Sequence, residues 1–356
     1  MQHNKYLVLG QMSGTSLDGQ DFVLAHFWKV SGQWKYKVLA AKTFPYPEDF
    51  VDRLKLAHQL SSAALGELNS AYGDITQLQL QEFLAEHPNF QPDLLSFHGH
   101  TVRHKPEKGI TYQLGTWQQW ADIFQMPLVG EFRKPDVALG GQGAPLVPGG
   151  DIHLFQTYDY TLNLGGFANV TDLTLPTPIA YDLCAVNVVL NQWANTLGLP
   201  FDAGGALAAR GTLLPDLFAE LNRLAFYQQK PPKSLGREWV VNAIEPLVAA
   251  YLHHDIRDLL HTYCCHVSSQ IGQIFPTDKK VLVTGGGAKN HFLMEQLQKQ
   301  TTASIERGDT TLVDYKEAMI FAFLGLLCHE GQVNCWASVT GASKNHTTGI
   351  VFFPRL

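Results

Sequence analysis

The sequence lacks a long hydrophobic run and an excess of positive charge. No stretch approaches the about 18 consecutive apolar residues of a membrane-spanning helix. The apolar run at residues 6–9 is too short for the core of a signal peptide. Charged residues make up 16% of the 356 positions, and the formal net charge is −6. Because a nucleic-acid binder normally carries a basic stripe, we expect neither a nucleic acid nor a membrane as a partner.

Cysteine is scarce, and its spacing shows no disulfide or metal pattern. The five cysteines are Cys184, Cys264, Cys265, Cys328 and Cys335. Their number is odd and no two form a CxxC pair, which is typical of a reducing compartment and favours a cytoplasmic location. Hydrophobic residues, in contrast, make up 45% of the chain. A sizeable core can therefore form, and disorder is not expected.

Two groups of residues raise the question of a metal site. His98, His100 and His104 follow one predicted strand, and His261 and Cys265 would share one face of a predicted helix. A single neutral polar contact from His100 is as consistent with the first group. For the second group, we favour a helix that packs its cysteines inward.

Strand and helix patterns alternate along the chain, which indicates an α/β class. The length suggests about two domains. A strand–loop–strand pattern at residues 6–27 returns at 160–175. Residues 136–150 form a Gly/Pro-rich loop, and such a long loop in a compact domain is usually functional. Helices are predicted, among others, at 49–86, 116–124, 185–197, 245–273, 291–300 and 317–329.

The first strand–loop–strand pattern contains MSGTSLDG at residues 12–19. Backbone amides near Gly14 can approach a phosphate closely because no Cβ intervenes. The loop nearly matches a P-loop, but Gln20 and Asp21 replace its Lys and Ser/Thr, and a strand follows instead of a helix. An ordinary hairpin turn is the alternative. The predicted ATP contacts are Ser13, Gly14, Thr15, Ser16, Asp18 and Gly19, with Asp18 as the Mg²⁺ ligand.

Two further glycine-bearing loops follow strands in the second half. They are NLGGFAN at 163–169 and GGGAKN at 285–290. The second superficially resembles a dinucleotide fingerprint, but Asn290 stands where that fingerprint has glycine. A strand end that accepts adenosine fits better. The ATP contacts predicted here are Asn163, Gly165, Gly166, Asn169, Gly285, Gly286, Gly287 and Asn290.

The three loops, in this order, resemble the nucleotide site of the actin/hexokinase/heat-shock-ATPase superfamily. Further motifs narrow the resemblance to the anhydro-N-acetylmuramic acid kinases, and they span nearly the whole chain. Besides the three loops, the matching segments are FHGHTVR (97–103), EFRKPD (131–136), GGQGAPLVP (140–148), EAMIFAF (317–323) and SVTGA (338–342). The combination of the segments at 12–19 and 140–148 is very specific.

The resemblance implies two actin-like (ribonuclease-H-like) domains with a nucleotide and sugar cleft between them. The first domain would comprise residues 1–150, with 336–356 returning to it, and the second 151–335. The implied reaction converts 1,6-anhydro-N-acetylmuramic acid, ATP and water to N-acetylmuramic acid 6-phosphate and ADP in peptidoglycan recycling, with Mg²⁺ bridging the phosphates. A homodimer is also implied.

The resemblance assigns roles to five side chains. Asp136 would be the base that activates water. Arg103 suits the lactyl carboxylate of the sugar, and His100, Glu317 and Asp182 would also border the substrate. The residues alone leave other roles open: a loop-capping Asp136, a surface Arg103 paired with an acid, and a Glu317 that stabilises a helix N-terminus.

The chain departs from the family at residues 181–187. Many members have Asp-Thr-Gly-Pro-Gly-Asn near here, and this chain has YDLCAVN. Asp182 and Asn187 remain, but the glycines and the proline are absent. A kinase for another anhydro sugar, such as levoglucosan, is therefore one alternative. An actin-like nucleotide-binding protein without sugar chemistry is another, although it would not need Asp136 beside the loop at 140–148.

Overall fold

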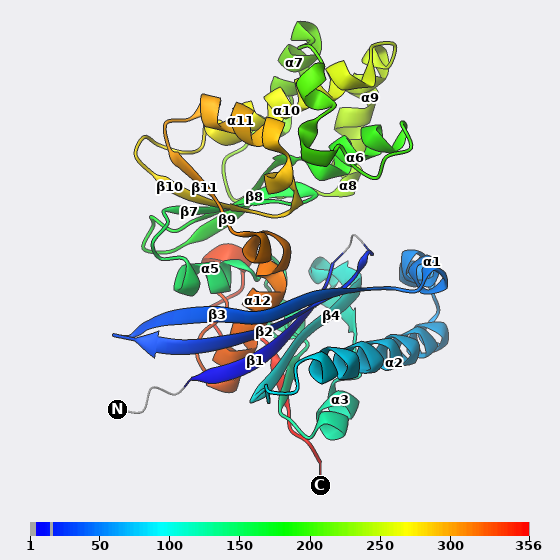
Figure 1. The fold of residues 1–356 in the computed structure, drawn as a ribbon, viewed down its shortest axis with the longest axis vertical. Coiled ribbons are helices and arrows are strands. Elements are labelled where there is room, and N and C mark those ends of the chain that lie inside the picture. Colours follow the sequence, from blue (N-terminus) through cyan, green and yellow to red (C-terminus); the bar gives the residue numbers. More distant parts are fainter. Residues whose placement is uncertain (1–4, 15–16, 356) are drawn as a thin grey trace. The chain divides into compact units, whose positions relative to one another are not determined.

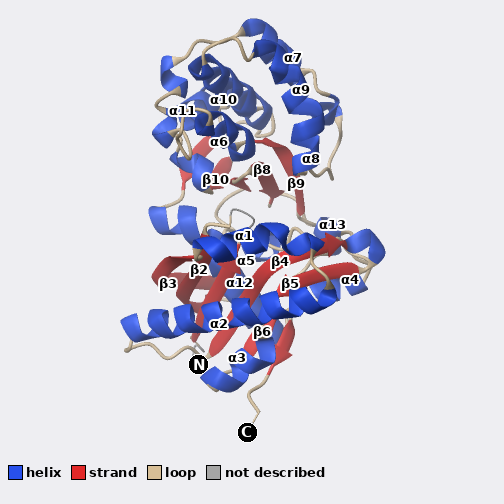
Figure 2. Cartoon of the chain, turned by 90° about the vertical axis from the view of Figure 1, so that its right-hand side faces the viewer, coloured by secondary structure: helices blue, strands red, loops and turns tan. Residues whose placement is uncertain are grey.

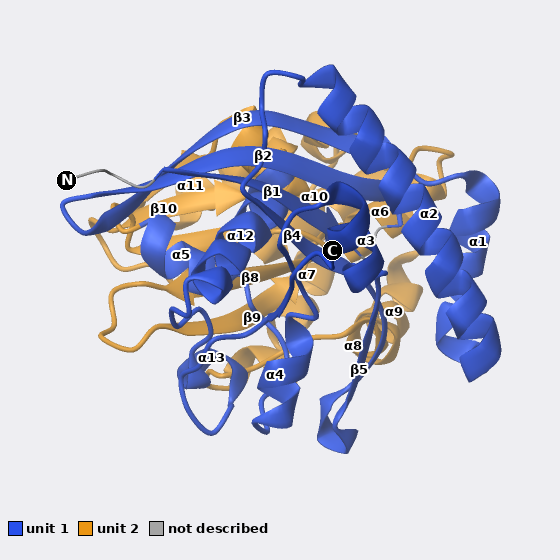
Figure 3. Ribbon diagram, turned by 90° about the horizontal axis from the view of Figure 1, so that it is seen from below, with its two compact units in different colours: residues 1–155, 315–356 blue, residues 156–314 orange. Residues whose placement is uncertain are grey.

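The structure is a computed structural model, which describes residues 5–14 and 17–355. Two of the predicted ATP contacts, Thr15 and Ser16, lie outside the described residues. The chain divides into two compact units (Figure 3): unit 1 runs to Phe155 and resumes at Tyr315, and unit 2 is Gln156–Asp314. The sequence-based boundary at 150 falls inside helix α5, and unit 1 resumes 21 residues before position 336.

Unit 1 is built on a seven-stranded mixed sheet (Figure 1) with the order β12-β6-β4-β1-β2-β3, and β5 pairs with β4. The first three strands form an antiparallel meander, β4 runs parallel to β1, and β6 runs parallel to β4. The strands are β1 (Tyr6–Ser13), β2 (Gly19–Val30), β3 (Gln33–Pro45), β4 (Leu94–Lys105), β5 (Ile110–Leu114), β6 (Leu128–Gly130) and β12 (Ile350–Phe352).

Helices cover both faces of this sheet (Figure 2). The helices of this unit are α1 (Glu48–Leu56), α2 (Ser62–Glu86), α3 (Trp117–Phe124), α4 (Arg133–Ala138), α5 (Pro148–Leu154), α12 (Thr310–His329, in unit 1 from Tyr315 on) and α13 (Ala337–Thr340), with 3₁₀ turns η1 (Ala57–Gln59) and η2 (Pro106–Lys108). Leu9 and Phe22 face the core shared with α2 and α3. Gly10 faces α12, where a Cβ would lie 2.3 Å from the carbonyl oxygen of Ala318. Because successive side chains of a strand point to opposite faces of the sheet, neighbouring residues pack against different helix layers.

Three sequence-based element bounds in unit 1 are wrong. The helix predicted at 49–86 is interrupted, because Ser61 caps a new helix by accepting from the backbone N of Ala64 at 3.3 Å. The loop predicted at 136–150 contains the end of α4 and the start of α5. The helix predicted from 317 begins at Thr310, where Asp309 accepts from the backbone N of Leu312 at 2.8 Å.

Unit 2 repeats the strand order in a five-stranded sheet, β11-β10-β7-β8-β9. Again the first three strands form an antiparallel meander, and the last two run parallel to the first. The strands are β7 (Tyr160–Leu164), β8 (Phe167–Asp172), β9 (Ile179–Ala185), β10 (Lys280–Thr284) and β11 (Ser304–Arg307). Leu162 and Val283 pack against Val267 of α10 in one core.

The helices of unit 2 are α6 (Asn187–Asn195), α7 (Pro215–Asn222), α8 (Arg237–Trp239), α9 (Glu245–Val248), α10 (Ile256–Gly272) and α11 (His291–Gln300). Shorter 3₁₀ or π segments are η3 (Ala203–Gly205), η4 (Ala208–Arg210), η5 (Ala225–Gln228), η6 (Val240–Ile244), η7 (Ala249–Tyr251) and η8 (Gly286–Lys289). The single helix predicted at 245–273 is wrong. Asp255 is extended and caps α10 by accepting from the backbone N of Arg257 at 2.8 Å.

The predicted α/β class is confirmed, since each unit pairs a mixed sheet with helices. Within residues 5–14 and 17–355, no helix has the length and apolar character needed to cross a membrane.

Candidate active site

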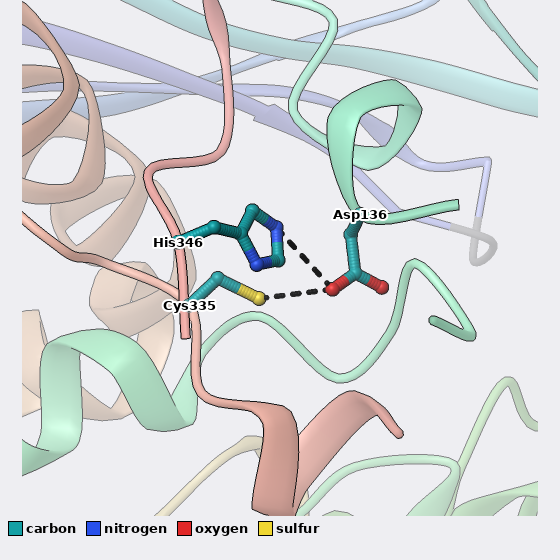
Figure 4. Close-up of side chains that lie close together, drawn as sticks. All are labelled: Asp136, Cys335 and His346. Carbon is teal, nitrogen blue, oxygen red and sulfur yellow. Dashed lines mark hydrogen bonds and ion pairs between the residues drawn. The ribbon is translucent and has the colours of Figure 1, made fainter. Parts of the chain in front are cut away.

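Asp136 lies on α4 and is completely buried in unit 1. Its Oδ1 accepts from the Thr340 hydroxyl at 2.6 Å and from the Cys335 thiol at 3.2 Å, and its Oδ2 accepts from the backbone N of Gly143 at 2.6 Å. His346 Nε2 lies 3.4 Å from Oδ1 (Figure 4). These contacts fix the orientation of the carboxylate.

The glycine-rich loop after α4 wraps around this carboxylate. Gly140 and Gly143 have φ of +80° and +68°, a left-handed conformation that favours glycine. At Gly141, a Cβ would lie 2.2 Å from Oδ2 of Asp136. The motif therefore needs glycine both for the path of the backbone and for its close approach to Asp136.

Arg133 lies one turn before Asp136 and links His98 to the glycine-rich loop. Its Nε donates to His98 Nε2 at 3.1 Å, and its Nη1 donates to the Gly143 carbonyl at 2.8 Å. His98 Nδ1 must then carry the proton that is donated to the Gly99 carbonyl at 2.9 Å. Burial and the Arg133 charge hold the pKa of His98 well below its usual value. Burial lowers the pKa of Arg133 to about 10, so it stays charged at neutral pH, and Glu317 opposes that shift.

Glu317 lies inside α12, seven residues after the helix begins at Thr310. It therefore does not stabilise the helix N-terminus, which was the alternative role. Burial raises the pKa of its carboxyl, while Lys316 and Arg133 lower it. Lys316 in turn forms a buried ion pair with Asp151 at 2.8 Å.

Ser13, at the carboxyl end of β1, lies beside His100, in the middle of β4, in the parallel pairing of the two strands. The Ser13 hydroxyl lies 2.9 Å from His100 Nδ1 and 2.6 Å from the Tyr46 hydroxyl. Burial lowers the pKa of His100 to about 4, so the ring is neutral at pH 7. Ser13, predicted to contact ATP, and His100, predicted to contact the sugar, therefore belong to one buried hydrogen-bonded group.

Arg103 lines a pocket of about 550 Å³ beside α4. The walls include Lys134, Tyr112 and Val137, the residue after Asp136. The Arg103 guanidinium donates to the Leu60 carbonyl. Among the described residues, its hydrogen-bond partner is thus a carbonyl and not the acid of the alternative interpretation.

The remaining predicted residues of the first hairpin lie at its turn. Gly14 is partly buried and Asp18 is exposed. Gly19 begins β2 at a point where a Cβ would lie 2.2 Å from the Phe44 carbonyl oxygen. Of this group, Asp18 presents an exposed carboxylate.

In unit 2, the structure brings two predicted glycine loops together. The parallel pairing of β7 with β10 sets Thr284 beside Asn163, so the loops at 165–166 and 285–287 leave the same edge of the sheet. Gly285 has φ +82°, and a Cβ there would lie 2.5 Å from Asn163 Oδ1. Backbone amides, rather than charged side chains, therefore dominate this edge.

Three other predicted residues of unit 2 make structural contacts. Asn290 caps α11, since its Oδ1 accepts from the backbone N of Leu293 at 2.9 Å. Asp182 Oδ2 accepts from the backbone N of Leu235 at 2.8 Å, and burial raises the pKa of its carboxyl. Asn169 stands between Asn163 and Asp182 in the strand register.

Sequence reasoning missed several residues around the predicted ones. Thr340 lies in the SVTGA motif, and Arg133 in EFRKPD, so the motifs held a signal for both. Cys335 and His346 gave none, because they reach Asp136 only through the fold. The histidines considered as metal ligands have other partners: His104 Nδ1 lies 3.1 Å from the Thr111 hydroxyl, and His261 Nδ1 lies 2.9 Å from the Ala208 carbonyl.

A family profile described as anhydro-N-acetylmuramic acid kinase matches residues 6–354. A protein of that name from Pseudomonas putida is 34% identical and covers 97% of this chain and 99% of its own length. One from Chromobacterium violaceum is 33% identical over 98% of this chain and 99% of its own length.

Solved structures show weaker likeness. Component A of the (R)-2-hydroxyglutaryl-CoA dehydratase of Acidaminococcus fermentans is 14% identical, covers 90% of this chain and 97% of its own, and has a TM-score of 0.47. That score is too low to support an argument about fold or function. The full-length sequence matches, in contrast, are decisive: the chain belongs to the anhydro-N-acetylmuramic acid kinase family.

Proposed function

We propose that the chain uses ATP and water to convert 1,6-anhydro-N-acetylmuramic acid to N-acetylmuramic acid 6-phosphate. The observation that carries the proposal is the buried Asp136 carboxylate, held by three hydrogen-bond donors inside the glycine-rich loop. Its support is the family membership over residues 6–354. No observation favours another anhydro sugar or a nucleotide-binding protein without catalysis.

Asp136 acts as the general base. A carboxylate offers about four acceptor positions, and the donors from Thr340, Cys335 and Gly143 fill three of them. The remaining position, on Oδ2, accepts the proton of the attacking water. Because Asp136 is fully buried, this water enters together with the sugar, and bulk water stays out.

Between non-hydrogen atoms, the reaction makes two bonds and breaks two. Water attacks C1 from the face opposite the anhydro bridge, as in an inverting glycosidase. The C1–O6 bond breaks, and the water proton goes to Asp136. O6 then bonds to the γ-phosphorus as the bond to the ADP oxygen breaks. Phosphoryl transfer neutralises the developing charge on O6, so no separate strong acid is required.

Arg103, Glu317, His100 and Asp182 contact the sugar. Arg103 lines the pocket beside α4, and its guanidinium suits the lactyl carboxylate. His100 is neutral at pH 7 and therefore serves as a hydrogen-bonding group without charge. Asp182 keeps acceptor capacity beyond its bond from Leu235.

The nucleotide contacts are backbone amides and hydroxyls of the predicted loops. The glycines at 165–166 and 286–287 leave their amides at one sheet edge, which suits phosphate oxygens, whereas the Gly285 amide donates to the Val313 carbonyl at 3.3 Å. The described residues of the first hairpin, Ser13, Gly14 and Gly19, take the same role. The exposed carboxylate of Asp18 fits Mg²⁺, a hard cation that keeps several waters. When bound, Mg²⁺ neutralises charge on the phosphates.

We also propose a cytoplasmic location and a homodimer. The location is supported by the odd cysteine count and by five free cysteines in the described residues. The homodimer rests on the family resemblance, and analytical ultracentrifugation tests it.

One experiment tests the reaction. The protein is incubated with ATP, Mg²⁺ and the anhydro sugar in ¹⁸O-labelled water, and the product is analysed by mass spectrometry. We expect N-acetylmuramic acid 6-phosphate with one labelled oxygen at C1. Label elsewhere would contradict the assigned water attack. Turnover of levoglucosan but not of the muramyl sugar would contradict the substrate.

A further inference from the structure

The Ser13 hydroxyl connects His100 to a buried tyrosine that the proposed reaction does not use. It lies 2.9 Å from His100 Nδ1 and 2.6 Å from the hydroxyl of Tyr46. Ser13, His100 and Tyr46 are 2%, 4% and 6% exposed. In a buried group of this kind, the direction of one hydrogen bond determines the direction of the next.

Tyr46 follows β3, and its ring packs in the core of unit 1. The ring centroid lies 5.5 Å from that of Phe50 and 6.4 Å from that of Tyr72. Burial raises the pKa of the Tyr46 hydroxyl well above its usual value, so the hydroxyl keeps its proton at neutral pH. The packing therefore holds the ring in place, and the hydroxyl always has a proton to donate.

The neighbouring Tyr72 hydroxyl has hydrogen bonds of its own. The backbone N of Gly99 donates to Gln11 Oε1 at 3.0 Å, so the other amide atom of Gln11 is the nitrogen. This nitrogen donates to the Tyr72 hydroxyl at 3.0 Å and to Gln20 Oε1 at 2.8 Å. Tyr72 in turn donates to Gln20 Oε1 at 3.1 Å. Because the proton of Tyr72 is used there, Tyr46 receives no proton from this neighbour and can donate its own to Ser13.

The His100 ring presents either a donor or an acceptor to a ligand. Burial lowers its pKa to about 4, so at pH 7 the neutral ring has one N–H and one acceptor nitrogen. Nδ1 faces Ser13. Nε2 has no hydrogen-bond partner among residues 5–14 and 17–355, and it is not one of the fully buried polar atoms that lack a partner. Nε2 is therefore the ring atom left for a ligand, and its proton depends on the bond at Nδ1.

We propose that Tyr46 is a positioning residue for His100. It donates to Ser13, Ser13 donates to His100 Nδ1, and Nε2 thereby carries a proton that is donated to an acceptor oxygen of the anhydro sugar. The contact with the sugar rests on the proposed function, whereas the assignment of the proton to Nε2 does not. No proton is transferred along this chain of hydroxyls, which only decides which group the ring presents.

Removal of the Tyr46 hydroxyl leaves the direction of the Ser13 proton undefined. Ser13 is then free to accept from Nδ1 as well as to donate to it, because a hydroxyl is both donor and acceptor. In the molecules where Nδ1 carries the proton, Nε2 is an acceptor and repels the sugar oxygen. Tyr46→Phe retains the ring that packs against Phe50 and Tyr72, so this variant removes the hydroxyl alone.

The position of the proton is read directly by ¹⁵N NMR of the full-length protein with labelled histidine rings. The His100 signals are identified by their loss in His100→Gln. At pH 7 we expect the proton on Nε2 in the wild type and a mixture of the two tautomers in Tyr46→Phe. A proton on Nδ1 in the wild type, or unchanged His100 signals in Tyr46→Phe, would overturn the proposal.

The matched control is Tyr227→Phe in unit 2. The Tyr227 hydroxyl lies 2.9 Å from His266 Nε2, so this variant also removes a hydroxyl beside a buried histidine. It should change the His266 signals and leave those of His100 as they are. A change of the His100 signals in this control as large as that in Tyr46→Phe would mean that the effect is not specific to Tyr46, and would overturn the proposal.

Steady-state kinetics tests the contact with the sugar. Tyr46→Phe should raise the KM for the anhydro sugar about 3–10-fold, the effect of one hydrogen bond, and keep kcat and the KM for ATP within about twofold. Tyr227→Phe should keep the wild-type KM for the sugar. In the His100→Gln protein, Tyr46→Phe should cause no further rise, because its effect passes through His100.

The role of Tyr46 and the proposed function fail on different results. A shifted tautomer with an unchanged KM for the sugar would overturn the contact between Nε2 and the sugar. An equal rise of that KM with and without His100 would show a general structural effect and overturn the positioning role. If the wild type forms no N-acetylmuramic acid 6-phosphate while Tyr46→Phe still shifts the tautomer, the proposed function fails and the assignment of the proton stands.

Discussion

The two units share a strand order but differ in what they place around the first hairpin. In unit 1, the end of β1 and the middle of β4 hold buried polar side chains, including Ser13, His98 and His100. In unit 2, the corresponding ends of β7 and β10 are followed by glycines whose backbone packs tightly. Unit 2 thus offers amide groups, and unit 1 offers buried polar side chains.

The same strand order is therefore used for two kinds of chemistry in the two units. Phosphate oxygens need N–H donors, which any glycine-rich strand end provides. Proton transfer needs a particular carboxylate with a defined environment. Substitution of Asp136 in unit 1 should therefore change the rate, whereas substitutions in the glycine loops of unit 2 should change nucleotide binding and stability.

Replacing the proposed base should have the largest effect. We expect Asp136→Asn to lower kcat by about 10³-fold, since a neutral amide accepts no proton. Nucleotide binding, measured by calorimetry, should persist. The matched control is Asp202→Asn in unit 2, whose carboxylate accepts from the backbone N of Leu207 at 2.8 Å and of Ala208 at 3.0 Å. It should lower the melting temperature and leave kcat intact; the reverse pattern would refute the distinction between the units.

The buried histidines should make both units sensitive to acid. Burial lowers the pKa of His100 in unit 1 to about 4 and that of His266 in unit 2 to about 3. The unfolded chain binds these protons near pH 6.5, so stability falls as the pH drops below 6.5. The loss should amount to about 2–3 kcal/mol per histidine by pH 4.5.

Urea unfolding at pH 7 and pH 4.5 measures this loss. Replacing either histidine by Gln should reduce the difference in unfolding free energy between the two pH values. Below pH 4 the His100 contribution should level off, while that of His266 continues to about pH 3. An unchanged difference in the His266→Gln protein would show that its ring is charged in the folded state.

Substitution of a glycine in unit 2 should have the next largest effect. Gly285→Ala forces a left-handed conformation at φ +82° and places a Cβ 2.5 Å from Asn163 Oδ1. We expect a loss of about 1–3 kcal/mol in stability and a higher KM for ATP. Gly286→Ala meets its nearest atom only at 3.8 Å and should keep the wild-type stability. Equal melting temperatures for the two variants would argue against the packed loop.

Substitutions of two threonines should have the smallest effects. Thr340→Val in unit 1 removes a donor from buried Asp136 and should cost about 1–3 kcal/mol in stability, together with a lower kcat. Thr284→Val in unit 2 removes a buried hydroxyl that has no hydrogen-bond partner in the described part of the chain. That change should be neutral or slightly stabilising by thermal unfolding. A destabilised Thr284→Val protein would reveal a partner for this hydroxyl.

Local sequence patterns were enough for predictions that concern a single short segment of the chain. Gly141 and Asp136 stand five residues apart, and their motif predicted a functional loop. Asn290 shows the limit of this reasoning: its place before a helix is a capping signal, yet the glycines beside it suggested adenosine. Cys335 and His346 could not be linked to Asp136 because their proximity depends on the tertiary path of the chain.

Helix bounds failed for a related reason. Leucine spacing continues across residues 49–86, but Ser61 competes for the backbone and starts a new helix. Asp255 and Asp309 do the same at α10 and α12. Periodicity predicted the buried face of each helix, while single capping residues decided where each helix begins.

The buried amides of the first hairpin have a consequence for how it pairs. Gln11 Nε2 donates to Gln20 Oε1 at 2.8 Å and to the Tyr72 hydroxyl at 3.0 Å, and Gln11 Oε1 accepts from the backbone N of Gly99 at 3.0 Å. If β1 slipped by one residue against β2, Gln11 would turn to the other face of the sheet and lose these partners. The network therefore penalises misregistered pairing and sets the length of the loop between the two strands.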